Sequence, residues 1–312
     1  MSAPSFSART FRIVVALILL LVVGAGAWLL LRAPVQAPPP PAPVVLEEPM
    51  EAPEVVELQL LHIEGEVEVR ASGGDWRAAV VGEQLEPAGA VRTGAEGRVV
   101  MGSTASYEVQ LDPGTHISVE ALTHSISRLL LERGMATANV REQRHVFEVA
   151  TAGSDAVARS DDGSFTVSND GAGTVAVASH RGEVELSGAG RLVVVRAGQQ
   201  SLVLAGQAPT EPSPIPESLL LKVQWPQQAT LRQRRLVVAG ESVPGTQVEI
   251  GGHPVTVGAD GRFTTEIELR EGRNPLRVRA RGVGGQERTL EREVQVDTTA
   301  PKVGLDRDLW GD

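Results

Sequence analysis

The chain contains no cysteine. Disulfide bonds, thiolate metal sites and a cysteine nucleophile are therefore excluded, and the compartment cannot be inferred from disulfide usage. The N-terminal segment has to supply that information instead.

Aromatic residues are scarce, at 3% of the chain, whereas 33 glycines and 20 prolines are spread along it. A core with so few rings has to be built from many small aliphatic side chains, a composition that favours β-structure. The frequent turn residues leave most segments too short for helices of ordinary length. We therefore expect an all-β fold and, in 312 residues, more than one domain.

Positive charge is in deficit, because 29 Lys and Arg residues face 39 Asp and Glu residues, which gives a net charge of −10. No Lys/Arg-rich stripe is available to hold a phosphate backbone, so nucleic acid is not an expected partner. The densest basic cluster, Arg232, Arg234 and Arg235, either contacts an anionic polymer or lies on a solvated strand face.

The strong local signatures of catalysis are also missing, among them the nucleophile elbow, the P-loop and His-Glu-x-x-His. We therefore expect no enzyme, and no catalytic, cofactor-binding or metal-binding residues. Asp161, Asp162 and Asp170 lie near glycines and either hold calcium or close turns, and they lack EF-hand spacing. The histidines are isolated in the sequence, at His62, His116, His124, His145, His180 and His253.

One long uncharged and mostly aliphatic run occupies residues 13–31. At about 1.5 Å of rise per residue, a helix of this length matches a hydrocarbon core of roughly 30 Å, so we expect a transmembrane helix. Arg9 and Arg12 precede the run and an acidic stretch follows it. This charge bias places the tail, residues 1–12, in the cytoplasm and the rest of the chain on the other side.

A cleaved signal peptide is the alternative, since Ala25, Gly26 and Ala27 resemble a small-residue cleavage site. The apolar run continues past this site to Leu31, and Trp28 lies where an interfacial aromatic residue is expected. These residues favour an uncleaved anchor.

Two proline-rich stretches divide the remaining chain. The first, residues 32–57, has the composition of an extended spacer that advances about 3.1 Å per residue. The second, residues 208–218, marks a boundary between two domains, residues 58–207 and 219–301. Trp76 and Trp225 are expected in core or interface positions, and Trp310, in the polar tail 302–312, is expected to be exposed.

The segment 58–207 is predicted to form short strands. At its start, Leu60, His62 and Glu64 alternate with Leu61 and Ile63, which predicts two opposite strand faces. The spacing of later strands suits repeated coils, as in a β-solenoid, or a sandwich. Three turn sequences separate these strands, namely Asp112-Pro113-Gly114, Asp161-Asp162-Gly163 and Asn169-Asp170-Gly171.

Several motifs follow one another here as they do in FecR-type periplasmic domains: residues 63–67, Trp76, Gly82, residues 91–94, 97–98, 111–115, 165–167, 173–177, 182–184 and 195–200. The segment therefore resembles a FecR-like domain, which implies a β-solenoid-like module in the periplasm on a bacterial inner-membrane anchor. Well-known members of that family regulate sigma factors. Residues 1–12 are too few to fold a sigma-binding unit, so we expect the fold and compartment to carry over without sigma regulation.

The segment 219–301 contains further alternating runs, at about the density of seven strands in an immunoglobulin-like sandwich. It resembles the bacterial immunoglobulin-like modules of the glucodextranase-B type through Pro244, Gly245, residues 260–263, Leu269, Glu271, Gly272, Asn274 and residues 297–301. Such modules serve as spacers or binding surfaces, and the resemblance names no ligand.

These features together predict a membrane-anchored, non-catalytic binding or scaffold protein of the bacterial envelope. Its expected partner is an envelope protein or a cell-wall polysaccharide. The alternative is a signalling protein that senses the envelope and acts through a partner membrane protein. A carbohydrate-active enzyme is the third hypothesis, for which the chain nominates no pair of acids among its many carboxylates.

Overall fold

The computed structural model describes residues 16–23, 57–103, 106–123, 125–141, 145–228 and 230–299. Contacts between residues group the chain into two units, Met1–Glu51 and Ala52–Asp312. In the first unit, residues 16–23 are helical. None of the helical structure described is both long enough and apolar enough to cross a membrane.

Several predicted segments fall wholly or partly outside the described residues. They are the tail 1–12, the remainder of the 13–31 helix, nearly all of the spacer 32–57, and the tail 302–312 with Trp310.

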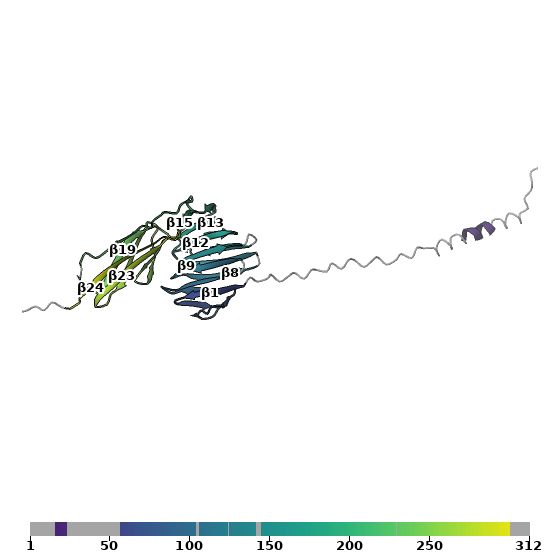
Figure 1. Cartoon of the computed structure of the whole chain (residues 1–312). Coiled ribbons are helices and arrows are strands. Elements are labelled where there is room, and N and C mark those ends of the chain that lie inside the picture. Colours follow the sequence, from purple (N-terminus) through teal and green to yellow (C-terminus); the bar gives the residue numbers. More distant parts are fainter. Residues whose placement is uncertain are drawn as a thin grey trace, which may run out of the picture. The chain divides into compact units, whose positions relative to one another are not determined.

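The second unit is built from strands, and they account for all the regular structure described in it (Figure 1). The all-β prediction is therefore confirmed for this part of the chain. Its strands fall into two sets, β1–β16 and β17–β24, which we call the first and second lobes.

The first lobe has two layers that share two long strands. Layer A contains β1 (Leu58–Glu64), β4 (Gln84–Leu85), β6 (Arg98–Ser103), β7 (Tyr107–Leu111), β12 (Gly163–Asn169), β15 (Gln199–Val203) and β16 (Ser213–Pro214). Layer B contains β2 (Val67–Arg70), β3 (Arg77–Ala78), β5 (Ala90–Thr93), β8 (His116–Leu122), β10 (Val146–Thr151), β11 (Val157–Ser160) and β14 (Arg191–Arg196). The shared strands are β9 (Ile126–Val140), which begins in layer B, and β13 (Val175–Gly188), which begins in layer A.

The core of the first lobe lies between these layers and consists mostly of small aliphatic side chains. Three buried rings stand among them, with centroids 4.9 Å apart for Tyr107 and Phe147 and 6.2 Å apart for Phe147 and Phe165. The Ser127 hydroxyl lies 2.9 Å from both the Tyr107 hydroxyl and Nε2 of His145, so the buried polar groups are paired. Burial raises the pKa of Tyr107.

The predicted alternation at the start of this lobe is interrupted by a β-bulge. The pairing of β1 with β6 shifts between Leu60 and His62. Before the bulge, the even-numbered Leu58 and Leu60 are fully buried. Beyond it, the odd-numbered Ile63 packs against the core instead. A bulge inserts one residue and reverses which side chains face inward, so the prediction of two uninterrupted faces was wrong here.

Strand β9 passes from layer B to layer A at Gly134, where φ is +100°. A Cβ at this position would lie 2.4 Å from Cα of Thr115 in the adjacent corner. The Thr115 hydroxyl lies 3.0 Å from the amide nitrogen and 3.1 Å from the carbonyl oxygen of Met135, so it holds the two corners together. Glycine is needed at this bend both for its backbone conformation and for the close approach.

The second lobe has two layers around a separate core. Layer C contains β17 (Leu221–Gln224), β19 (Arg235–Ser242) and β22 (Arg262–Glu268). Layer D contains β18 (Thr230–Leu231), β20 (Gln247–Ile250), β21 (His253–Val255), β23 (Gly272–Arg281) and β24 (Glu287–Val296). Most of β24 is an edge, and its alternating Glu and Arg side chains discourage further strand pairing.

The second proline-rich stretch runs beside β15. The backbone N–H of Thr210 donates to Leu202 at 2.9 Å, and that of Ile215 donates to Gly198 at 2.9 Å. Residues of the predicted linker 208–218 therefore pack on the first lobe, while the exact domain boundary stays a prediction.

Candidate binding surfaces

The two layers of the first lobe differ in how their outer faces are covered. On layer A, Met135, Ala176 and Ala178 form a small apolar cluster with Val283 of the second lobe, and all four are buried. On layer B, outward side chains such as Arg92, Glu120 and Glu185 are exposed. Layer B is therefore the open face of this lobe.

Ion pairs cross the open face from strand to strand. Glu148, on β10, is buried between two arginines, with Arg128 at 3.5 Å and Arg159 at 3.9 Å. Arg128 also pairs with Glu120 at 2.8 Å. This part of the face is nearly neutral because each charge has a partner of opposite sign.

Near the start of layer B, two arginine side chains lie against the ring of Trp76. The guanidinium carbon of Arg92 lies 4.4 Å from the centre of the indole ring and that of Arg70 lies 4.8 Å away. The His116 ring meets the indole edge-on, with centroids 5.2 Å apart. Trp76 is half-buried and lies outside the core between the layers. We call Trp76, Arg70, Arg92 and His116 the Trp76 cluster.

Strand pairing places Arg92 and His116 of this cluster in a row with Glu68 and Arg133. Arg92 is the register partner of Glu68 on β2 and of His116 on β8, and His116 is the partner of Arg133 on β9. The residues come from four neighbouring strands of layer B, so the row runs across the strands.

The row has more cations than carboxylates can neutralise. Glu68 pairs with Arg92 at 2.5 Å, and Glu132 pairs with Nδ1 of His116 at 2.9 Å. In the part of the chain that the structure describes, no carboxylate lies within pairing distance of Arg70 or Arg133. The guanidinium group of Arg70, over the indole, and that of Arg133, next to His116, are thus available for an external anion.

His116 is held neutral by its surroundings. Burial lowers its pKa, Arg133, Arg70 and Arg92 lower it further, and Glu132 acts in the opposite direction. Nδ1 of His116 lies 2.9 Å from the Glu132 carboxylate, and the other ring nitrogen, Nε2, is buried without a described hydrogen-bond partner. The cluster therefore gains a further positive charge only when the solution becomes acidic.

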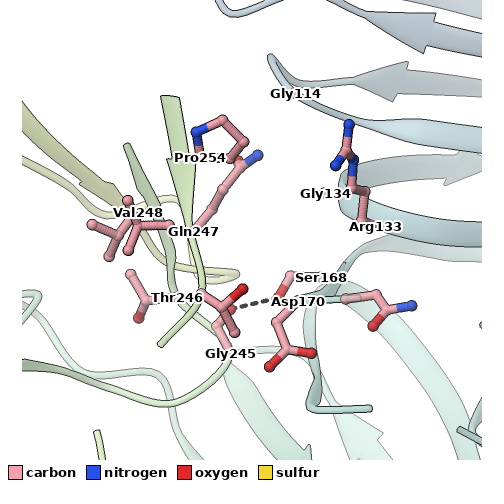
Figure 2. A pocket seen from close by; sticks show the side chains of 13 residues that line it. Gly114, Arg133, Gly134, Ser168, Asp170, Gly245, Thr246, Gln247, Val248 and Pro254 are labelled. Carbon is pink, nitrogen blue, oxygen red and sulfur yellow. Dashed lines mark hydrogen bonds between the residues drawn. The ribbon is translucent and has the colours of Figure 1, made fainter. Parts of the chain in front are cut away.

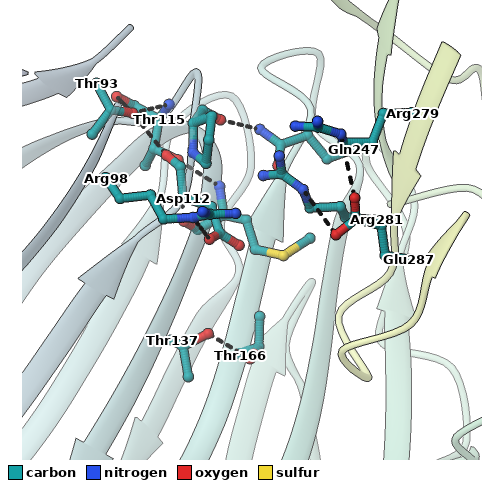
Figure 3. Close-up of polar contacts among 12 residues, drawn as sticks. Thr93, Arg98, Asp112, Thr115, Thr137, Thr166, Gln247, Arg279, Arg281 and Glu287 are labelled. Atoms are coloured by element: carbon teal, nitrogen blue, oxygen red, sulfur yellow. Dashed lines mark hydrogen bonds and ion pairs between the residues drawn. The ribbon is translucent and has the colours of Figure 1, made fainter. Parts of the chain in front are cut away.

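The lobes meet along a seam that Figures 2 and 3 show from two sides. The Ser168 hydroxyl donates to the carbonyl oxygen of Gly245, and Nε2 of Gln247 donates to that of Pro113 at 2.6 Å. A Cβ on Gly245 would come within 2.6 Å of Cβ of Ala176, so glycine allows the turn to lie directly on layer A.

Two cavities of 110 and 240 Å³ lie along the seam, and both reach Gly245 and Thr246. The smaller contains Arg133 and Asp170 in its wall, and the larger is lined mainly by apolar side chains such as Leu202, Leu219 and Val283. The seam is thus held by a few contacts and is incompletely filled.

Arg281 lies near the seam and is 8% exposed. Its register partner is Gln247, and Nε and Nη2 of Arg281 and Oε1 of Gln247 are all buried without a described hydrogen-bond partner. Glu287 is shared by Arg281 and Arg279, at 3.9 and 3.3 Å (Figure 3).

The predicted single histidines stay apart in the fold. His62 pairs with Glu64 at 3.2 Å, and Nε2 of His180 lies 2.9 Å from the Thr166 hydroxyl. Within the described residues, no three His, Asp or Glu side chains gather as metal ligands. His124 lies outside the described residues.

The acidic turns do not form a common calcium site. Asp161 and Asp162 precede β12 and Asp170 follows it, so a strand of seven residues, about 23 Å long at 3.3 Å per residue, separates them. Asp170 accepts backbone N–H bonds from Ala172 at 2.7 Å and Thr174 at 3.0 Å. Closing the turn is its observed role.

The basic cluster of the second lobe is spread over separate carboxylates. Arg234 lies 3.4 Å from Glu271, and Arg235 lies 3.7 Å from Glu266. Trp225 packs partly against the second core. These ion pairs favour the solvated alternative for Arg234 and Arg235.

Comparison with known proteins finds no matching family model and no matching curated protein. Among solved structures, a candidate anti-sigma factor from Parabacteroides distasonis is 20% identical, with a TM-score of 0.36, over 40% of this chain and 59% of that one. A polysaccharide lyase is 10% identical, with a TM-score of 0.20, over 78% of this chain and 40% of that one. The chain thus spans less than two thirds of either structure, and likenesses at these scores bear on neither site nor activity.

Proposed function

We propose that this protein is a membrane-anchored, non-catalytic binding or scaffold protein of the bacterial envelope. Residues 13–31 anchor it in the inner membrane with residues 1–12 in the cytoplasm, and a FecR-like and an immunoglobulin-like module lie in the periplasm. The supporting observation is the contrast between the faces of the first lobe. Layer A is covered by the second lobe at Met135, Ala176 and Ala178, whereas layer B is open and carries the Trp76 cluster.

This function predicts that the open face contacts the partner in the living cell. A photocrosslinking residue would replace Ser118 or Glu185 on layer B, and Val237 on the second lobe would be the control position, since it is 58% exposed. We expect crosslinked envelope material from the layer B positions and much less from position 237. Equal yields at all three positions would argue against a binding face on layer B.

The proposed orientation is tested separately with a reporter that is active only outside the cytoplasm, fused after Asp312. Activity is expected for a periplasmic second lobe. A cytoplasmic reporter would rule out the envelope function as a whole.

A second candidate function, envelope sensing through a partner membrane protein, draws on the incompletely filled seam. A seam with cavities and few hydrogen bonds suits two alternative packings of the lobes. Replacing residues 13–31 by an unrelated membrane helix separates the two functions, because a sensor should lose its output and a scaffold should tolerate the exchange.

A further inference from the structure

We propose that the Trp76 cluster, together with Arg133 beside His116, binds an acidic polysaccharide, with sugar rings packed on the indole and sugar carboxylates paired with Arg70 and Arg133. The inference rests on the proposed binding function and gives that function a site and a ligand class.

Trp76 lies outside the core of the first lobe. Although the core between the layers holds Tyr107, Phe147 and Phe165, the indole lies on the outer side of layer B and stays half-buried. A partly exposed aromatic plane offers apolar area together with a polar edge. The C–H groups on the face of a pyranose ring are suited to pack on such a plane.

The arginines of this region differ in whether they have an acidic partner. Arg92 is occupied by Glu68, whereas Arg70 and Arg133 have no acidic partner among the described residues. A guanidinium group matches a carboxylate with two parallel hydrogen bonds and costs less to dehydrate than an ammonium group. The two free arginines therefore suit carboxylated sugars.

The basic side chains of the row are spaced by the distance between adjacent strands. Arg92, His116 and Arg133 are register partners on adjacent strands, which lie about 4.8 Å apart. Basic side chains thus recur along the row at intervals close to the length of one sugar unit, although only Arg133 among these three is charged and unpaired. An extended polysaccharide laid across the strands can present one unit to each strand. Because the chain as a whole carries a charge of −10, attraction of a polyanion requires a local group of cations such as this one.

The test is a titration of the full-length protein in detergent micelles with polygalacturonate as the probe. Dextran is the neutral polysaccharide and poly-glutamate is the acidic peptide for comparison. We expect polygalacturonate to bind and both comparison polymers to bind at least tenfold more weakly. Absence of polygalacturonate binding, or equally tight binding of poly-glutamate, would overturn the proposed ligand class.

The variants locate the site. Trp76→Ala is expected to weaken binding about tenfold or more, and Arg70→Gln and Arg133→Gln severalfold each. Arg235→Gln, which alters an exposed arginine of the second lobe, is the matched control and should bind as the wild type does. Since Arg70 has no ion pair to lose, Arg70→Gln remains informative even if Trp76→Ala folds poorly. Unchanged affinity in both Arg70→Gln and Arg133→Gln would contradict the site.

Failure of this inference can be told from failure of the proposed function. If crosslinks form from layer B in cells while polygalacturonate does not bind, the binding face stands and the ligand class is wrong. If no crosslinks form from layer B, the binding function itself is lost.

Discussion

His116 links the charge of the open face to pH. Its pKa lies below the ordinary value of 6.5, chiefly because of burial. The unfolded chain therefore takes up this proton at a higher pH than the folded protein does. The stabilisation is complete above about pH 6.5 and declines as the pH falls towards the lowered pKa of the folded state.

We expect urea denaturation to show a lower midpoint at about pH 5.5 than at about pH 7.5, with a smaller difference in His116→Gln. His62→Gln is the control, because His62 is exposed on β1. His180, whose pKa is also lowered by burial, acts in the same direction in every variant. Equal pH dependence in the wild type and His116→Gln would contradict the assignment.

Asn169, at the end of β12, forms side-chain hydrogen bonds to the backbone of neighbouring strands and turns. It is 2% exposed, and its amide nitrogen donates to the carbonyl oxygens of Leu131, Glu132 and Ala152 at 2.8 to 3.0 Å. Asn169→Ala removes this side-chain donor from three carbonyl groups, of which that of Leu131 keeps the backbone N–H of Ala152, so we expect a loss of about 2 to 3 kcal/mol in the free energy of unfolding. Denaturant unfolding measures the loss. A change below about 0.5 kcal/mol would show that water replaces the hydrogen bonds of the Asn169 amide.

At the scale of elements, the corners of the first lobe depend on glycine. Gly134→Ala brings Cβ against Thr115 at a backbone angle that alanine rarely adopts, and we expect a cost of about 3 kcal/mol or more. Gly190→Ala is the matched control, because φ is +74° there and no atom lies within 4 Å of the new Cβ. Its cost should be near 1 kcal/mol. Similar unfolding midpoints for the two variants would show that the close approach contributes little.

The sequence predicts strands well where period-two alternation and turn residues agree. Of the predicted turns, the one at Asn169-Asp170-Gly171 joins the paired strands β12 and β13, while that at Asp112-Pro113-Gly114 leads from layer A to layer B. The bulge after Leu60 escapes prediction, because it depends on pairing with β6. The Trp76 cluster cannot be predicted from the sequence either, because it also depends on strand pairing. Arg92 and His116 become neighbours only when β5 pairs with β8.

At the scale of the second unit, the seam between the lobes is the feature that the sequence predicts least. Ala176 and Ala178 occupy the alternate positions of β13, where an ordinary solvent-facing residue is expected, yet they are 6% and 0% exposed. Their small size leaves room for the second lobe, and Val283 fills part of that room. Periodicity identifies which side chains leave the core but contains no information on what covers them.

Val283→Asp should therefore separate the lobes while leaving both cores intact, because Val283 belongs to the seam cluster and not to the second core. A carboxylate facing Met135 and Ala178 would be buried without a partner, and undocking restores its hydration. The chain lacks native cysteine, so spin labels on Glu185→Cys and Thr264→Cys report the distance between the lobes without background labelling. We expect a narrow distance distribution in the otherwise unaltered protein and a broad one with Val283→Asp. Val237→Asp, on an exposed strand position, should keep the narrow distribution. A narrow distribution in Val283→Asp as well would mean that the hydrogen bonds of Ser168 and Gln247 hold the seam without the apolar cluster.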